Sequence, residues 1–100
     1  MADFILFMHG DAPAGGDDSA WPAYFAKLRA GGHFEGGSAI GDGVCIRKGG
    51  ATPPIAAQLA GYIRVQAASL DEARRLVEGN PVYEAGGTIE IRELPRSGGG

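Results

Sequence analysis

His9 and Asp11 lie two residues apart, directly after a run of five apolar residues near the start of the chain, FILFM. An imidazole gains or loses a proton near neutral pH, and a carboxylate beside it would orient the ring. The pair therefore suits general acid–base catalysis. The same residues also fit a structural role, in which His9 forms a hydrogen bond at a strand end and Asp11 caps the following turn. Both interpretations require residues 3–9 to form a strand.

Strand geometry groups further polar side chains with His9. In a strand over residues 3–9, His9 shares a face with Ile5 and Phe7, because side chains alternate across a strand. Strands predicted over residues 61–66 and 88–94 would flank it and add polar side chains to that face, namely Gln66 and the four residues Tyr62, Arg64, Glu90 and Arg92. Apolar residues with a few convergent polar groups are typical of a small-molecule pocket. These four side chains are therefore predicted to bind a ligand, and arginine suits a carboxylate or an enolate-like charge.

Two helices are predicted to position this face. The first runs to residue 30 from N-caps among residues 17–19, and the second spans residues 69–78, where Ser69 and Glu72 form a capping box. Apolar residues at helical spacing give each helix one apolar face. These residues are Trp21, Tyr24, Phe25 and Leu28 in the first helix and Leu70, Ala73, Leu76 and Val77 in the second.

A further, weak strand is predicted over residues 33–40, with a bulge at its glycine pair. Residues 43–48 are expected to form another short extended piece, and residues 55–59 fit one helical turn. The order of elements, β-α-β-β-α-β, is that of a ferredoxin-like α+β fold. Its antiparallel sheet has the strand order 4-1-3-2, with both helices on one face. The domain is predicted to span residues 1–95, followed by a disordered tail at 96–100.

The predicted fold leaves one face of the sheet uncovered. The first strand is apolar on that face at Ile5 and Phe7, which is typical of a strand covered on both sides. A second copy of the chain is the simplest cover, so a homodimer is expected.

Composition limits the classes of partner. The net charge is −3 and the basic residues are scattered, which argues against nucleic acid. No apolar run is long enough to span a bilayer, and the N-terminus lacks the pattern of a signal peptide, so a cytoplasmic location is expected. Cys45 is the single cysteine, which excludes an internal disulfide, and is interpreted as a small apolar filler. No metal or cofactor motif is found, and none is predicted.

Three stretches of the chain resemble the YCII-related family, which includes the DGPF proteins. They are FMHGD near the start, GYIRVQAASLDEARRLVEGNP in the second half, and GGTIEIREL after it. The resemblance extends from Asp3 to Leu94. It implies a dimeric α+β barrel, in which two ferredoxin-like sheets pack face to face and leave clefts for small molecules. The biochemical roles of the family are mostly unassigned, although some members are proposed to use a histidine and an aspartate.

The chain departs from the family at the positions of that proposed pair. Residues 18–30, where the family places the histidine, contain none, and Asn80 stands where the aspartate of an Asp-Pro sequence is expected. The stretch ATPPIAAQLAG also lacks the acid of the Asp-Gly-Pro-Phe motif. An asparagine cannot act as a base near neutral pH, so the family's pair cannot be carried over to this chain.

These observations lead to two functional hypotheses. The first is a small-molecule-binding or accessory protein of the YCII-related type, with a cleft at the sheet and dimer interface. The alternative is a cofactor-independent isomerase or lyase, in which His9 acts as general base and Asp11 orients it.

Overall fold

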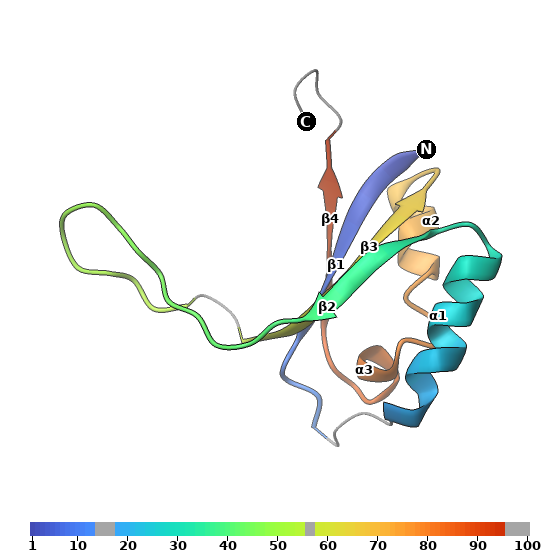
Figure 1. Cartoon of the computed structure of the whole chain (residues 1–100), viewed down its shortest axis with the longest axis horizontal. Helices are drawn as coiled ribbons and strands as arrows, with labels where there is room; N and C mark the ends of the chain where they lie inside the picture. The colour runs from blue at the N-terminus through green and yellow to red at the C-terminus, as the bar shows by residue number, and fades with distance from the viewer. Residues whose placement is uncertain (14–17, 56–57, 96–100) are drawn as a thin grey trace.

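A computed structural model of the chain describes residues 1–13, 18–55 and 58–95. It is a two-layer α+β fold, with a sheet on one side and the helices on the other (Figure 1). The strands are β1 (Ala2–His9), β2 (Phe34–Ala39), β3 (Leu59–Ala67) and β4 (Ile89–Leu94), and the sheet is antiparallel in the order β2-β3-β1-β4. The helical elements are η1 (Asp18–Ala20), α1 (Trp21–Ala30), α2 (Leu70–Arg75) and α3 (Pro81–Glu84). The predicted ferredoxin-like strand order is confirmed, whereas the predicted tail lies outside the described residues.

β1 is a central strand and pairs with β3 on one side and β4 on the other. Its Phe4, Leu6 and Met8 are buried against the helices. Ile5 and Phe7 lie on the opposite face of the sheet, which we call the outer face, and are half-buried there. The predicted alternation along this strand is therefore confirmed.

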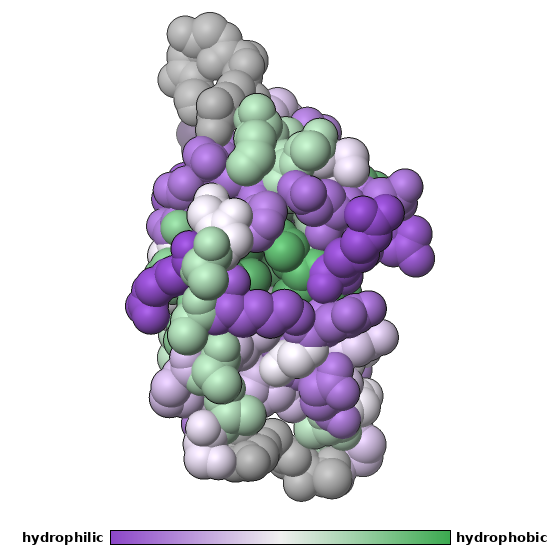
Figure 2. Space-filling view, turned by 90° about the vertical axis from the view of Figure 1, so that its right-hand side faces the viewer, coloured by the Kyte–Doolittle hydropathy of each residue, from purple (hydrophilic) through white to green (hydrophobic). Residues whose placement is uncertain are grey.

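The core between the layers is formed by the inner sides of β1 and β3 and by the two longer helices. Tyr24 and Leu28 of α1 are buried, and Trp21 and Phe25 pack against the same cluster, as predicted. Figure 2, which views the helical side, shows strongly apolar atoms in a recess among hydrophilic side chains. Within the core, the Tyr24 hydroxyl donates to the Leu76 carbonyl at 2.7 Å and so ties α1 to the segment after α2.

β2 contains the predicted bulge. Its register against β3 shifts between Phe34 and Gly36, and Gly36 has a φ of 124°, a conformation that favours glycine. At Gly37 a Cβ atom would lie 2.5 Å from the Tyr62 carbonyl oxygen, so β2 approaches β3 too closely for a side chain.

The two helix boundaries differ from the prediction. The N-cap of α1 is Ala20, whose side chain makes no capping bond, while Asp18 and Ser19 belong to η1 and residue 17 is not described. Pro22 at the start of α1 has no N–H group, so one donor that a cap would satisfy is absent.

α2 ends at Arg75 rather than at residue 78, although Ser69 accepts from the Glu72 N–H as the capping box predicts. Beyond the end of α2, side chains of α1 donate to backbone carbonyls that would accept hydrogen bonds within a longer helix. The Tyr24 hydroxyl donates to the Leu76 carbonyl, and the Lys27 Nζ donates to the Glu78 carbonyl. Leu70 is 52% exposed and does not join the predicted apolar face.

α3 was not predicted. Asn80 and Pro81 end the preceding segment, as expected, but they also start a new helix, because an asparagine N-cap followed by proline is a helix-start signal. The Asn80 Oδ1 accepts from the N–H groups of Val82 and Tyr83 at 2.9 and 3.2 Å. Its Nδ2 donates to the Met8 sulfur at 3.6 Å, and the side chain is fully buried.

Residues 41–55, which we call the arm, contain no helix or strand. The prediction of a helical turn at 55–59 is wrong for Leu59, which begins β3, and residues 56 and 57 are not described. The arm leaves the sheet after β2 on the side away from the helices (Figure 1). It raises the radius of gyration to 15.0 Å, against about 13 Å for a compact domain of this length.

No helix in the described part of the chain has the length and apolar character needed to cross a membrane.

Removing the Asn80 side chain should destabilise the fold. Asn80→Ala leaves two N–H groups of α3 without their acceptor in a buried place, so the free energy of unfolding should fall by roughly 1–3 kcal/mol. Urea unfolding followed by circular dichroism measures the loss. Asn80→Ser, which keeps a cap acceptor, should be less destabilised. Ser69→Ala, at the exposed cap of α2, serves as the matched control, and an equal loss in that control would contradict the role given to Asn80.

Candidate functional site

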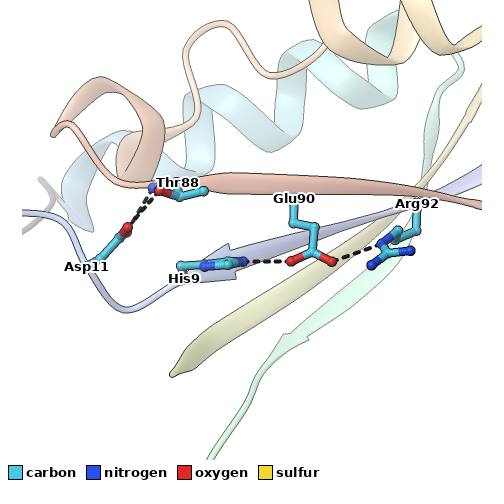
Figure 3. A network of polar contacts seen from close by, with 5 residues as sticks. All are labelled: His9, Asp11, Thr88, Glu90 and Arg92. Carbon is cyan, nitrogen blue, oxygen red and sulfur yellow. Dashed lines mark hydrogen bonds and ion pairs between the residues drawn. The ribbon is translucent and has the colours of Figure 1, made fainter. Parts of the chain in front are cut away.

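Three polar side chains form a connected network on the outer face (Figure 3). His9 Nε2 lies 2.9 Å from Glu90 Oε1, and the Arg92 Nε donates to Glu90 Oε2 at 2.9 Å. Glu90 lies opposite Phe7 in the β1–β4 ladder and reaches His9 diagonally. The network therefore joins the end of β1 to two successive outward positions of β4.

The charges in this network determine which ring nitrogen of His9 is free to accept a proton. Hydrogen bonds from Arg92 and then from His9 lower the pKa of the Glu90 carboxyl. Opposite an ionised Glu90, the Nε2 of His9 must carry the proton, which leaves Nδ1 of a neutral ring as the acceptor. The His9 side chain is 23% exposed and that of Arg92 is 69% exposed. The imidazole is thus held at a partly shielded edge of the face.

Asp11 bonds Thr88 rather than His9. Its Oδ1 accepts from the Thr88 N–H at 2.8 Å and its Oδ2 accepts from the Thr88 hydroxyl at 2.6 Å. These bonds lower the pKa of the Asp11 carboxyl, and in Figure 3 the carboxylate points to Thr88. The carboxylate that orients His9 is therefore that of Glu90. Asp11 instead stabilises the backbone near the turn, which is the structural role considered for it in the sequence analysis.

Tyr62 and Arg64 lie on the outer face of β3, as predicted. They are opposite Phe7 and Ile5 of β1, and β1 separates them from Glu90 and Arg92 on β4. Tyr62 is half-buried and Arg64 is exposed. The four predicted ligand-binding residues thus share one face, but only Glu90 and Arg92 contact each other.

The remaining histidine and the cysteine are held by backbone carbonyls. His33 Nδ1 lies 2.7 Å from the Gln66 oxygen and fixes the start of β2 to β3. The Cys45 sulfur lies 3.6 Å from the Pro54 oxygen, so Cys45 links the two limbs of the arm and is not the core filler that was expected. Within residues 1–13, 18–55 and 58–95, no three His, Cys, Asp or Glu side chains are grouped as a metal ion requires.

A hollow of about 510 Å³ lies between α1 and the inner face of the sheet, and sequence analysis did not identify it. We call it the aromatic hollow, since Trp21 and Phe25 line its helical wall. These two rings stack with centroids 5.4 Å apart. Its other lining residues are Met8, Asp18, Gly37, Ser38, Ala39, Ala60, Gly61, Tyr62, Ile63, Pro81 and Val82.

The aromatic hollow exists because the inner face of the sheet is built of small residues at this end. Ala39 pairs with Gly61 and Gly37 pairs with Ile63, whereas at the other end of the same strands Phe34 pairs with Val65. The glycines at 37 and 61 are visible in the sequence. Their meeting on one face depends on the bulge in β2, which shifts the register.

A second hollow, of about 570 Å³, runs beside β4. We call it the β4 groove. Val77, Ile89 and Ile91 give it an apolar floor, and its other lining residues are Asp71, Arg74, Arg75, Glu78, Tyr83, Gly87 and Thr88.

The structure is thus that of a small α+β domain with a two-layer core and two hollows. Comparison with a family model identifies the protein family to which this domain belongs. The model of the YCII-related domain matches residues 18–96, and the chain belongs to this family. No curated protein matches the chain.

A solved structure shares the fold. It is the 5-chloro-2-hydroxyhydroquinone dehydrochlorinase of Burkholderia phenoliruptrix, in complex with 2,5-dihydroxybenzoquinone. Its TM-score is 0.60 at 19% sequence identity, and the match covers 95% of each chain.

The lowered pKa values predict how acid acts on stability. Asp11 and Glu90 bind fewer protons in the folded state than in the unfolded state, because their pKa values are lowered on folding. Their contribution to the stability of the fold is therefore complete above their ordinary pKa values of 3.8 and 4.5. It is lost as the pH falls through the lowered folded values. The double variant Asp11→Asn, Glu90→Gln should therefore lose less stability on acidification below pH about 4.5 than the wild type. Urea unfolding at a series of pH values measures this. Asp42→Asn, on the exposed arm, is the control and should keep the wild-type slope.

Proposed function

We propose that the protein binds a small, flat and largely apolar organic molecule in the aromatic hollow, as a binding or accessory protein of the YCII-related type. The observation that carries this proposal is the pairing of stacked Trp21 and Phe25 on one wall with the glycines of β2 and β3 on the other. A volume of about 510 Å³ lies within the range of roughly 300–1,000 Å³ that is usual for ligand pockets.

The lining also favours a particular class of ligand. An aromatic wall suits a flat ring, which gains from stacking as well as from burial. Asp18 adds a carboxylate that would accept hydrogen bonds from ring hydroxyls. The dehydrochlorinase that shares this fold was solved with a dihydroxybenzoquinone, a ring of this kind. A hydroxylated aromatic or quinonoid ring is therefore the ligand class we propose.

A second candidate function rests on the hydrogen bond of 2.9 Å between His9 and Glu90. In this proposal the protein is a cofactor-independent isomerase or lyase that acts on the outer face. Nδ1 of His9 removes a proton from an acidic carbon, Glu90 orients the ring in place of Asp11, and Arg64 or Arg92 stabilises the enolate-like charge. His9 lies on the other side of the sheet from the aromatic hollow, so it cannot act on a ligand bound there. Of the two sites, we favour the hollow, and hence binding without proton transfer by His9.

Binding in the hollow can be followed through Trp21, the single tryptophan of the chain. Titration with 2,5-dihydroxybenzoquinone should quench its fluorescence in a saturable way, after correction with free N-acetyltryptophanamide. Ala39→Phe places a ring inside the hollow and should weaken binding by about tenfold or more, equivalent to at least about 1.4 kcal/mol. The matched control is Ala26→Phe on the exposed side of α1, which should bind as the wild type does. Equal affinity in both variants would place the ligand elsewhere.

Proton transfer by His9 has its own test. Carbon acids such as hydroxylated cyclic ketones are incubated with the protein in D2O, and exchange at the carbon is followed by NMR. If His9 is the base, His9→Ala should lower the exchange rate by about 100-fold or more. Glu90→Gln should also lower it, whereas Asp11→Asn should change it little, because Asp11 bonds Thr88. Exchange that survives in a folded His9→Ala protein excludes this function.

A further inference from the structure

The β4 groove lies apart from both candidate sites. It runs between α2 and the inner side of β4, where Ile89 and Ile91 pack against the core. It shares no lining residue with the aromatic hollow. Glu90 and Arg92, which belong to the polar network, lie on the outer face of the same strand. The β4 groove is therefore a third place on the described surface where a ligand can bind.

The floor of the β4 groove is formed by branched aliphatic side chains. Val77 is 6% exposed, whereas Ile89 and Ile91 are only half-buried. β4 is an edge strand among the described strands and α2 ends at Arg75, so the described helices leave the two isoleucines partly open. Apolar groups that cover these side chains gain free energy in proportion to the area removed from water. The floor therefore suits a branched aliphatic group.

The backbone beside this floor offers few free polar groups. The Gly87 N–H donates to the Val82 carbonyl, and the Thr88 N–H donates to the Asp11 carboxylate. The Thr88 hydroxyl also donates to Asp11, and the Thr88 carbonyl accepts from the His9 N–H. Polar recognition in the groove therefore depends on the side chains of α2 and of the turn that follows it.

Four charged side chains line the groove, and two of them are paired with each other. Arg74 Nη1 lies 3.6 Å from Asp71 Oδ1. Arg75 and Glu78 line the groove too, yet neither charged group forms an ion pair or a hydrogen bond with a residue that the structure describes. The Lys27 ammonium donates to the backbone carbonyl of Glu78 rather than to its carboxylate. The groove thus presents one free cation and one free anion.

Arg75 and Glu78 lie on the same side of the chain. The Glu78 N–H donates to the Arg75 carbonyl at 3.2 Å, a bond across three residues. In a turn of this kind the side chains at its two ends lie one above the other. A molecule that binds both side chains therefore needs a negative and a positive group close together.

An α-amino acid meets these requirements. Its carboxylate and its ammonium group are attached to one carbon atom, and its side chain can extend over the apolar floor. The planar guanidinium of an arginine binds a carboxylate through two parallel hydrogen bonds. A ligand with only a carboxylate would lie beside the unpaired Glu78, and a ligand with only an amine would lie beside the unpaired Arg75.

We propose that the β4 groove binds an aliphatic α-amino acid. The carboxylate of the amino acid lies on Arg75, its ammonium group lies on Glu78, and its branched side chain covers Ile89 and Ile91. The volume of the groove, about 570 Å³, lies within the range of roughly 300–1,000 Å³ that is usual for ligand pockets.

Binding is tested with L-leucine and two analogues that each lack one of its charges. 4-Methylpentanoate lacks the ammonium group, and 3-methylbutylamine lacks the carboxylate. NMR of the backbone amides should show saturable shifts at Gly87, Thr88 and Ile89, with a dissociation constant for leucine of about 1 mM or lower. Each analogue should bind about tenfold more weakly or worse. No saturable shift, shifts only at the aromatic hollow, or an analogue that binds as tightly as leucine would overturn the proposal.

Two exposed residues provide variants that should keep the wild-type fold. Arg75→Gln and Glu78→Gln should each weaken leucine binding by about tenfold or more, since each removes one charged partner of the ligand. Arg75→Gln should not weaken the binding of 3-methylbutylamine, and Glu78→Gln should not weaken that of 4-methylpentanoate.

The matched controls for these variants are Arg47→Gln on the arm and Glu35→Gln on β2. Both residues are exposed and lie outside the groove, so both variants should bind leucine as the wild type does. Because each control changes the net charge as its partner variant does, an equal loss in the controls would mean a non-specific effect of charge. That result, or wild-type affinity for leucine in either groove variant, would overturn the proposal.

Discussion

The position of β1 at the centre of the sheet is the constraint on which the rest of this structure depends. β1 hydrogen-bonds to β3 on one side and β4 on the other, and it carries apolar side chains on both faces. One face is covered by α1 and α2 through Phe4, Leu6 and Met8. The other carries Ile5 and Phe7 and ends at His9. The core and the polar network are therefore two sides of the same strand.

Periodicity predicted the elements whose pattern is local. The alternation in β1 and β3, the apolar face of α1 and the capping bond at Ser69 are all properties of residues within a few positions of one another. The ferredoxin-like strand order followed from the sequence of elements. α3 was missed because the pair Asn80 and Pro81 signals both an end and a start, and the N-cap bonds that the Asn80 side chain accepts show that the chain continues as a helix.

The details of the candidate site depended on register, which the sequence does not contain. Asp11 is close to His9 in the chain but bonds Thr88, while Glu90, at a separation of 81 residues, bonds the imidazole. The aromatic hollow has the same origin, because the bulge in β2 brings Gly37 and Gly61 onto one face. The sequence therefore identified the polar residues of the outer face, whereas strand pairing determined which of them form hydrogen bonds with each other.

The pairing of β1 with β4 also has a consequence for the newly made chain. Asp3 pairs with Leu94, so β1 leaves the ribosome long before its partner β4 has been made. At roughly 5–20 residues per second, an apolar strand waits for about 5–20 s before its sheet can close. Native pairing of β1 with β4 cannot form until β4 has emerged, and contacts so distant in sequence form slowly. The FILFM segment is thus the part of the nascent chain with the greatest need of protection from aggregation.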